Sequence, residues 1–365
     1  MNDQREQQVL ERLEQARRRP PAFTAPRIDM SHGAGGKATH KLIEGLLLPA
    51  LTNPALAPLA DAALLPFGEA RLALTTDAFV VHPLVFPGGS IGELAVNGTV
   101  NDLAVAGATP LGLSVALIIE EGLDTAVLRR EVDAMAAAAA RAGVAIVTGD
   151  TKVVERGKGD GLYIVTTGVG VADPTLSLSA TAVRPGDKII CSGTLGDHGM
   201  AIMIARGNLD LEAEVCSDTR ALTPLVAALK EATGLGADGG GGLRFMRDPT
   251  RGGVGTVLNE LARDSGYGVA VWEEMLPIRA VVQGACEILG LDPLYVANEG
   301  KLLAVVAPDV ADAALAALRG VAGGEDAALI GEVRAEPARM VLMHTQFGGT
   351  RMVDMLVGDP LPRIC

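Results

Sequence analysis

The first half of the chain alternates apolar segments of strand length with alanine-rich segments that have the pattern of helices. RLALTTD ends at Asp77 and VAIVTGD ends at Asp150, while PLGLSVALIIE and residues 162–172 are two further strand-like segments. Ser90 and Glu93 have the spacing of a capping box, which predicts that a helix begins there. Alternation of strands and helices is typical of a mixed α/β fold, and we expect this fold class for both halves of the chain.

A chain of 365 residues is long for a single hydrophobic core, so two domains are expected. The polar, turn-rich segment from Pro174 to Pro185 is the best candidate boundary. Beyond it, strands are predicted near 188–192, 268–272, 301–307, 328–334 and 339–345, and helices near 197–206, 220–233, 252–264, 277–290 and 309–320. The predicted organisation is a mobile arm at 1–27 with a helical pattern within 1–19, an N-terminal domain at 28–174, a C-terminal domain at 175–345 and a flexible tail at 346–365.

Composition argues against several classes of function. Aromatic residues are 3% of the chain and its net charge is −13, so binding of nucleic acid is not expected. No apolar run approaches the roughly 18 residues of a membrane span, and the polar N-terminus has no secretory segment. Four cysteines without paired spacing suggest neither a disulfide framework nor a zinc site. A reducing cytoplasm is the expected location, where the thiols stay free.

Four aspartates, Asp77, Asp102, Asp150 and Asp248, share a sequence context. Each lies at the end of an apolar segment or in a small-residue turn, in TTDAF, VNDLA, GDTK and RDPTRGG. A single aspartate of this kind is more often a helix cap or a turn former. Four of them, in the setting where α/β proteins bind ligands, favour a site in which Mg²⁺ joins carboxylates to nucleotide phosphates.

Basic and small residues next to these aspartates suit a phosphate group. Lys152 and Arg251 complement phosphate charge, and Gly252 and Gly253 precede a helix whose N-terminus can receive phosphate. The candidate cofactor-binding residues are therefore Asp77, Asn101, Asp102, Asp150, Asp248, Thr250, Arg251, Gly252 and Gly253, of which the four aspartates are the candidate metal ligands.

The stretch YVANEGK contains Glu299, which has two equally supported interpretations. One is a solvated turn with a local ion pair to Lys301. The other is a general base, because a carboxyl group in a confined pocket can have its pKa raised toward neutrality. His198, in GTLGDHGM, is assigned a supporting role at a helix start.

The glycine-rich segment HGAGGK matches a phosphate-binding P-loop only in part. Ser31 stands six residues before Lys37 where glycine is needed, and Ala38 follows the lysine. A plain hinge and a phosphate-contacting loop stay equally supported, with His32 as a candidate contact. A helix is expected from about Thr39 to Pro49.

The chain ends in PRIC, so its last side chain is the thiol of Cys365. A last residue is often frayed, and an accidental cysteine is one interpretation. A terminal thiol is also accessible to other molecules, and the adjacent terminal carboxylate is expected to raise its pKa. The other cysteines, Cys191, Cys216 and Cys286, lie within apolar stretches.

The motif order HGAGG, TTDAF, VNDLAVAGA, GDTKVV, RDPTRGG, NEGK and PRIC resembles the HypE family of hydrogenase maturation proteins. That family belongs to the superfamily of aminoimidazole ribonucleotide (AIR) synthetase, selenophosphate synthetase and thiamine-monophosphate kinase. The resemblance covers about residue 28 to the end, and the PRIC ending selects HypE within the superfamily. It implies a two-domain AIR synthetase-like fold, a homodimer formed through the N-terminal domains, and ATP bound between the domains.

By this resemblance, the metal and phosphate ligands are Asp77, Asp102 and Asp150 on the first domain and Asp248, Thr250 and Arg251 on the second. Lys152 and Glu299 match positions near the phosphate and the incoming cysteine, and Cys365 matches the modified thiol. The implied reaction is ATP-dependent dehydration of an S-carbamoyl group on Cys365, delivered by the carbamoyltransferase HypF. The resulting thiocyanate donates cyanide to iron held by the HypC–HypD complex.

Two alternatives stay open. Another ATP enzyme such as selenophosphate synthetase has a similar scaffold, although it usually carries cysteine or selenocysteine in the N-terminal glycine-rich segment, and HGAGG has none. A non-catalytic carrier would offer its terminal thiol to partners, but such a carrier needs no base at Glu299.

Overall fold

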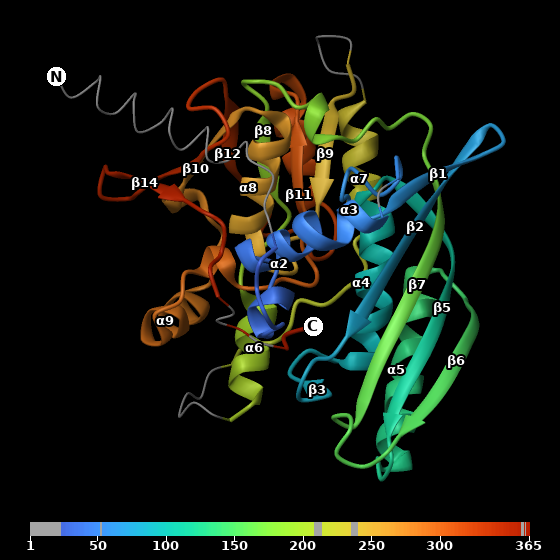
Figure 1. Cartoon of the computed structure of the whole chain (residues 1–365). Coiled ribbons are helices and arrows are strands. Elements are labelled where there is room, and N and C mark those ends of the chain that lie inside the picture. Colours follow the sequence, from blue (N-terminus) through green and yellow to red (C-terminus); the bar gives the residue numbers. More distant parts are fainter. Residues whose placement is uncertain (1–22, 52, 208–213, 235–239, 359–360, 362) are drawn as a thin grey trace.

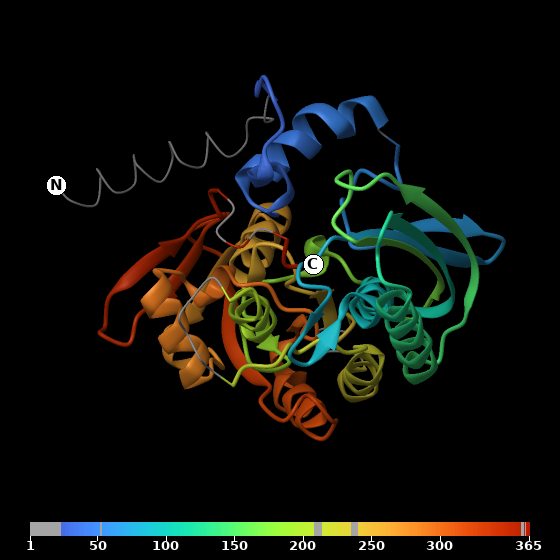
Figure 2. The ribbon, with the colours of Figure 1, turned by 90° about the horizontal axis from the view of Figure 1, so that it is seen from below.

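The computed structural model describes residues 23–51, 53–207, 214–234, 240–358, 361 and 363–365, and the helix predicted within 1–19 lies outside them. Two large β-sheets with their helices lie next to each other, and the chain ends between them (Figures 1 and 2). A small third sheet pairs β3 (Val85–Phe86) with β4 (Gly89–Ser90). The mixed α/β class is confirmed. Among the described residues, no helix is both long and apolar enough to cross a membrane.

The first sheet has five strands and is covered by helices on one face. Its strand order is β1 (Ala63–Phe67), β2 (Ala70–Phe79), β7 (Leu162–Ala172), β5 (Ala108–Glu120) and β6 (Ile146–Val154). Only β5 and β6 run parallel. The helices α4 (Ile91–Val105) and α5 (Thr125–Ala142) pack side by side, and α4 contacts β2, β7 and β5. Residues of β7 alternate strictly in burial, because successive side chains point to opposite faces.

Helix α4 lies at the junction of the two domains. It is buried along nearly its whole length and also contacts α7 and β9 of the second domain. An apolar helix of small residues suits a position that is covered on all sides. The helix begins directly after Ser90, as predicted, but the capping box is wrong: the Ser90 side chain makes no capping hydrogen bond and its buried Oγ has no partner.

The second sheet has seven strands in the order β14-β13-β10-β12-β8-β11-β9. Their bounds are β8 (Lys188–Cys191), β9 (Leu243–Arg247), β10 (Gly268–Trp272), β11 (Leu303–Val306), β12 (Ala328–Arg334), β13 (Val341–His344) and β14 (Thr350–Val353). The helices are α6 (Asp197–Ala205), α7 (Thr223–Thr233), α8 (Gly253–Ser265), α9 (Ala280–Leu289) and α10 (Ala311–Arg319). Strands β9 and β14 were not predicted, and β14 shows that a purely irregular tail from 346 is wrong.

Both faces of this sheet are covered. Ile189 and Ile190 are successive residues of β8, and they belong to different apolar clusters. The cluster of Ile189 includes residues of α8, and that of Ile190 includes residues of α7 and α10. A strand covered on both sides needs apolar residues at consecutive positions, which explains the sequence IIC.

A helical segment before the first sheet packs on the second domain. It consists of α2 (Lys37–Leu42), a π-helical turn (Ile43–Leu47) and α3 (Leu48–Leu51), close to the helix predicted from Thr39 to Pro49. His40 lies 3.0 Å from Glu260 of α8 and 3.4 Å from Glu44. Burial alone would lower the pKa of His40, but hydrogen bonds to Glu260 and Glu44 outweigh burial and raise it to about 9.

Replacement of His40 by glutamine is expected to destabilise the protein in a pH-dependent way. A histidine pKa raised above its unfolded value contributes stability that is fully present below pH of about 6.5 and is lost as the pH rises through about 9. His40→Gln should therefore lower the free energy of unfolding by about 1–3 kcal/mol near pH 6 and by much less near pH 10. Denaturant titrations at the two pH values measure this, and an equal loss at both contradicts the prediction.

Candidate active site between the two domains

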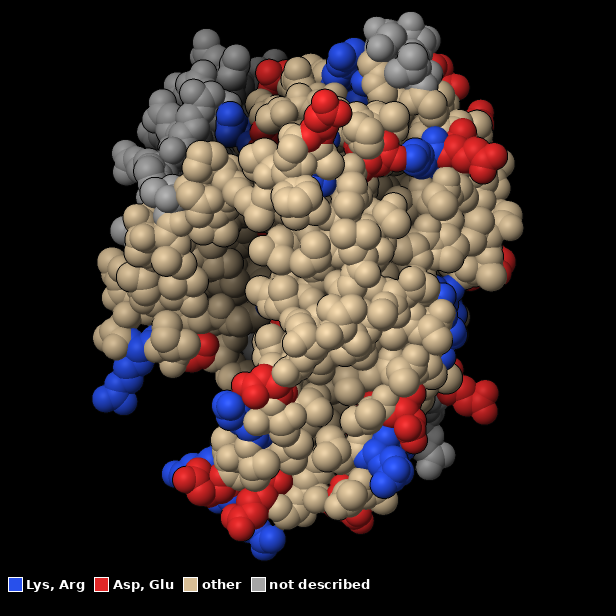
Figure 3. All heavy atoms as spheres, turned by 90° about the vertical axis from the view of Figure 1, so that its right-hand side faces the viewer, with Lys and Arg blue, Asp and Glu red and all other residues tan. Residues whose placement is uncertain are grey.

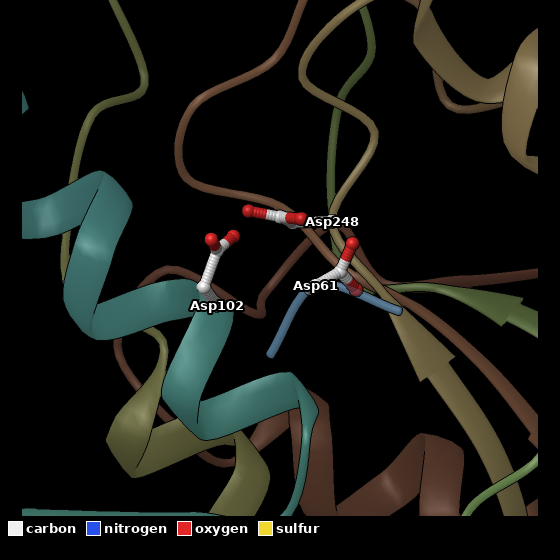
Figure 4. Close-up of side chains that lie close together, drawn as sticks. All are labelled: Asp61, Asp102 and Asp248. Atoms are coloured by element: carbon white, nitrogen blue, oxygen red, sulfur yellow. The ribbon is translucent and has the colours of Figure 1, made fainter. Parts of the chain in front are cut away.

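Three carboxylates meet at the domain junction. Asp102 lies on α4, Asp248 directly follows β9, and Asp61 lies in the loop before β1 (Figure 4). One oxygen from each lies within 4.8 Å of the others. Asp102 and Asp248 were predicted as ligands, whereas Asp61 was not, because the short strand that follows it was not recognised in the sequence. Arg247 Nε pairs with Asp61 at 2.8 Å and offsets part of the negative charge, and a bound cation would offset the rest.

The electrostatics of this cluster are those of a site built for a cation. Burial raises the pKa of Asp102 well above its usual range, and the neighbouring carboxylates of Asp77, Asp248 and Asp61 raise it further. Burial and the charges of Asp61 and Asp77 also raise the pKa of Asp248. A divalent cation would reverse these shifts, because it favours the charged form of every ligand.

Asp77 and Arg251 extend the cluster into a cavity of about 320 Å³. The nearest side-chain atoms, Asp77 Oδ1 and Arg251 Nη2, lie 3.5 Å apart. Asp77 was placed at the end of its strand, which is wrong: β2 continues to Phe79 and Asp77 projects from within it. The cavity is lined by Thr75, Asp77, Asp102, Asp248, Thr250, Arg251, Glu299 and Cys365 among others. Of the candidate residues, Asp150 and Lys152 on β6 and also Asn101, Gly252 and Gly253 are not part of this lining.

Glu299 is buried next to this cavity, and hydrogen bonds to its main-chain amide and carbonyl fix its position. Its side chain is 3% exposed, and its Oε1 atom has no hydrogen-bond partner. The Glu299 amide donates to Asp218 at 3.0 Å, and its carbonyl accepts from Asn101 at 3.1 Å. Asp218 also pairs with buried Lys301 at 3.0 Å. The solvated-turn interpretation of Glu299 is wrong, and Asp218 is a supporting residue that the sequence did not reveal.

Burial raises the pKa of Glu299 well above its usual range. Charges on Asp248, Asp218 and Asp77 act in the same direction, and Arg251 opposes them. A carboxyl group with a raised pKa transfers protons at neutral pH more effectively than an ordinary glutamate.

Asn101 does not present its amide to the cavity. Its Nδ2 donates to the carbonyls of Arg220 and Glu299, and its Oδ1 accepts from the Leu222 amide at 2.8 Å. These contacts tie α4 of the first domain to two segments of the second. In this arrangement Asn101 holds the site together, and its predicted role as a direct cofactor contact has no geometric support.

Asp150 and Lys152 lie away from the cluster. Asp150 is opposite Ala116 of β5, which is opposite Val165 of β7, which is opposite Ala78 of β2. Three strand-to-strand steps of about 4.8 Å separate Asp150 from the neighbourhood of Asp77 by about 14 Å. Asp150 was predicted at the tip of its strand, but β6 continues to Val154, and that placement is wrong.

The side chains of Asp150 and Lys152 are exposed and pair with each other at 3.1 Å. Hydrogen bonds from Lys152 and from the Thr151 amide lower the pKa of Asp150. The pair lies on an edge strand of the sheet, since β6 is the last strand in the order. One copy of the chain therefore does not bring these two residues to its own acidic cluster.

The glycines of RDPTRGG shape the start of α8. Gly252 has φ of 71° and Gly253 has φ of 58°, a conformation that side chains rarely adopt. A Cβ atom on Gly253 would lie 2.5 Å from the Leu294 carbonyl oxygen. The glycines thus allow the chain to pass from Thr250 and Arg251, which line the cavity, into α8 without a backbone clash.

The HGAGG segment packs onto this same region. A Cβ on Gly35 would meet Arg251 at 2.7 Å, and the Lys37 amide donates to the Leu356 carbonyl of the tail at 2.8 Å. His32 is buried and contacts Asp29 at 2.9 Å, so its ring is engaged locally. Contacts to Arg251 and to the tail make this segment part of the wall of the site.

The end of the tail is inserted between the domains. The Val80 amide donates to the main-chain oxygen of Cys365 at 3.0 Å, and Arg363 Nε donates to the Val80 carbonyl at 3.1 Å. Ile364 and Leu361 are buried in the apolar cluster of the first domain and α6. The expectation that the Cys365 thiol is freely accessible is therefore wrong for this conformation.

Cys365 lines the cavity together with Glu299 and Asp77. Burial raises the pKa of the Cys365 thiol to about 12, and the carboxylate of Glu299 adds to the shift. The predicted direction is confirmed, but the main cause is burial, not the terminal carboxylate. In this position the sulfur is held next to a candidate base and, through Arg251, next to a candidate phosphate site.

Two family models match the chain. The AIR synthase related protein, N-terminal domain, matches residues 59–172, and the AIR synthase related protein, C-terminal domain, matches residues 184–342. Together they cover more than half of the chain, which shows its family.

Individual relatives agree with these models. A carbamoyl dehydratase HypE of Bradyrhizobium diazoefficiens is 54% identical over 338 residues, which is 93% of this chain and 96% of that protein. The crystal structure of a HypE–HypF complex matches with a TM-score of 0.80 and 45% identity, covering 86% of this chain and 99% of that one. HypE in complex with ATP matches with a TM-score of 0.76 and 46% identity, covering 93% and 100%.

Proposed function

Since this chain belongs to the AIR synthase related family and, within it, to the HypE carbamoyl dehydratases, we propose that it dehydrates a carbamoyl group carried on its own Cys365. The reaction uses ATP and serves hydrogenase maturation. The observation that carries the proposal is that Cys365, Glu299 and the acidic cluster line one cavity. A substrate thiol, a buried carboxyl group and a candidate phosphate site are therefore brought together by a single chain.

The chemistry follows from the properties of an amide. A thiocarbamate, S–CO–NH₂, loses water poorly, because its oxygen is a poor leaving group. Transfer of the terminal phosphoryl group of ATP to that oxygen yields ADP and converts the oxygen into a phosphate leaving group. The carbon–oxygen bond then breaks, the two nitrogen protons are removed, and S–C≡N and phosphate remain.

Residues of this chain supply the proton transfer and the orientation. Glu299 takes a proton from the carbamoyl nitrogen, since its Oε1 has no partner and its carboxyl group is buried on the same cavity as Cys365. Arg251 balances negative charge in the cavity, being close to Asp77. The hydrogen bond to Asp218 and that from Asn101 keep the backbone of Glu299 in place.

Mg²⁺ fits the acidic cluster, and Asp61, Asp102 and Asp248 would hold it, with Asp77 nearby. The donor set is all carboxylate oxygen, which is the ligand type of a hard divalent cation. When bound, the ion neutralises phosphate charge during phosphoryl transfer.

A second copy of the chain explains the remote position of Asp150 and Lys152. The open face of the first sheet is largely uncharged over its middle (Figure 3), and Leu65, Leu74 and Val147 are exposed there or at its edges. Exposed apolar area on an edge strand and open sheet face favours association. In a homodimer formed through this sheet, Asp150 and Lys152 reach the phosphate site of the partner.

The expected partners follow from the reaction. HypF supplies the carbamoyl group, consistent with the solved complex of a relative, and the HypC–HypD complex accepts the cyanide. The four cysteines of the chain are free thiols. A carrier thiol needs a reducing compartment, so we place the protein in the cytoplasm.

Mass spectrometry of the intact protein tests the proposed function. Carbamoylated protein incubated with ATP and Mg²⁺ should lose the mass of one water molecule, and the same sample without ATP should not. A carbamoyl mass that survives complete ATP turnover would exclude the dehydratase and leave a thiol carrier.

Replacement of Asp61 by asparagine tests the cation site. The variant is expected to need about 10–100-fold more Mg²⁺ for the same ATP affinity, because one charged ligand is lost. Calorimetric titrations of ATP at several Mg²⁺ concentrations measure this shift. Asp133→Asn, at an exposed position of α5, is the matched control and should leave the Mg²⁺ dependence unchanged. Unchanged dependence in Asp61→Asn would remove Asp61 from the site.

A further inference from the structure

Helix α6 holds the last residues of the tail at both of its ends. Arg206, just beyond the helix, donates to the Arg363 carbonyl at 2.6 Å, and His198, in its first turn, lies 2.9 Å from the Ile364 carbonyl through Nε2. Arg363 itself has a φ of 55°, which is costly for a residue with a side chain. Contacts from outside the tail are therefore needed to keep it in this conformation.

The ring of His198 is buried, and its contacts fix its orientation toward the Ile364 carbonyl. Its side chain is fully buried, and its ring meets Phe86 edge to face at a centroid distance of 5.6 Å. Nδ1 lies 2.8 Å from Ser217 Oγ, which itself accepts from the Thr219 amide at 3.1 Å. Because the Ile364 carbonyl can only accept a hydrogen bond, the proton of a neutral imidazole is on Nε2, which faces that carbonyl. Nδ1 then accepts from the Ser217 hydroxyl.

The inserted tail creates a conflict between the two steps of the reaction. Cys365 is half-buried in a cavity of about 320 Å³ and is preceded by buried Ile364, so the active site of a second enzyme cannot enclose the sulfur there. Carbamoylation by another enzyme therefore requires the tail to leave. Dehydration requires it to return, since Glu299 is buried on the cavity. A contact that is made only by the inserted tail sets the balance between the two steps.

We propose that His198 is a positioning residue for dehydration: its hydrogen bond to the Ile364 carbonyl keeps Cys365 in the cavity and limits the time the thiol spends outside it. The inference rests on the proposed function. His198 touches neither the thiol nor the phosphate site, and it acts through the last peptide bond of the chain. The Ile364 carbonyl sets its tautomer, and the contacts to Ser217 and Phe86 set the orientation of its ring.

Alkylation of the thiols tests this without any catalysis. In His198→Leu, iodoacetamide should label Cys365 about three- to tenfold faster than in the wild type, the effect of losing one buried hydrogen bond. His198→Gln keeps an N–H near the position of Nε2 and should restore most of the protection, whereas the shorter His198→Asn should not. His344→Leu, which changes a histidine stacked on Trp272, is the matched control and should label like the wild type.

The other cysteines report on the same samples. Exposed Cys216 should label equally in every variant, and buried Cys191 and Cys286 should stay unlabelled while the fold is intact. If His198→Leu unfolds, the labelling rates of Cys365 in His198→Gln and His198→Asn are compared instead, and they test the same hydrogen bond. Wild-type labelling of Cys365 in His198→Asn, with Cys191 still protected, would overturn the proposal.

The loss of the His198 hydrogen bond is expected to affect the rates of carbamoylation and dehydration differently. His198→Leu should slow dehydration of protein carbamoylated beforehand about three- to tenfold, while its rate of accepting a carbamoyl group should be unchanged or higher. A parallel fall of both rates with unchanged labelling would overturn the proposal. Failure of the carbamoylated wild type to lose water with ATP would instead overturn the proposed function. The labelling experiment would still show whether His198 holds Cys365 in the cavity, because it does not depend on catalysis.

Discussion

Cys365→Ala is expected to abolish carbamoylation of the chain and to leave its ATP affinity within about twofold of the wild type. The substitution removes the only atom that carries the substrate. It retains the contacts that seat the tail, because the Val80 amide binds the main-chain oxygen of residue 365 and Ile364 and Leu361 supply the buried apolar surface. Intact mass after incubation with the carbamoyl donor measures the first effect, and calorimetry measures the second.

Cys216 provides the control for this experiment. It is the exposed cysteine of the described chain, so it is the thiol most open to an unspecific reaction. Cys216→Ala should be carbamoylated and dehydrated like the wild type. A carbamoyl group that persists on Cys365→Ala and disappears from the double variant would show that Cys216 is an acceptor and that the terminal thiol is not required.

Much of the fold could be predicted from the sequence where local patterns determine it. Alternating burial on β7 and consecutive apolar residues on β8 follow from how many faces of each sheet are covered. Strands β9 and β14 were missed, because each is short and lies beside glycine-rich segments that have the composition of loops. Their pairing depends on partners far away in the sequence, which a local pattern does not contain.

The sequence predicts which types of residue form the site, but it does not predict which of them lie close together in space. Asp102 and Asp248 meet, whereas Asp150, which also follows an apolar segment, lies on the far edge strand, because strand order in a sheet is not sequence order. Asp61 stands before a strand that was not recognised, and Asp218 stands in a polar segment with no motif. His198 has a role only because the tail returns to α6, a contact between residues 166 positions apart.

Glu299→Gln is expected to accept the carbamoyl group at the normal rate and to dehydrate it about 10²–10⁴-fold more slowly. Glutamine has nearly the same shape, so the tail and the cavity are kept, but an amide cannot accept the proton that leaves the carbamoyl nitrogen. In the proposed sequence of steps, the carbamoyl group is accepted with the tail outside the cavity, where Glu299 is not involved. Intact mass in single-turnover experiments separates the two steps, since the carbamoyl form should accumulate in the variant.

The comparison variants show whether the loss is chemical or structural. Glu332→Gln changes a glutamate that pairs with Lys188 on the second sheet, and it should dehydrate normally. Asp218→Asn weakens the contact to the Glu299 amide but leaves the carboxyl group of Glu299 in place, so an intermediate loss of dehydration rate is expected. Rapid nitrile formation in Glu299→Gln would remove Glu299 from the role of base. Slow nitrile formation together with normal carbamoylation would separate this chain from a simple thiol carrier, because a carrier has no step that a buried carboxyl group can accelerate.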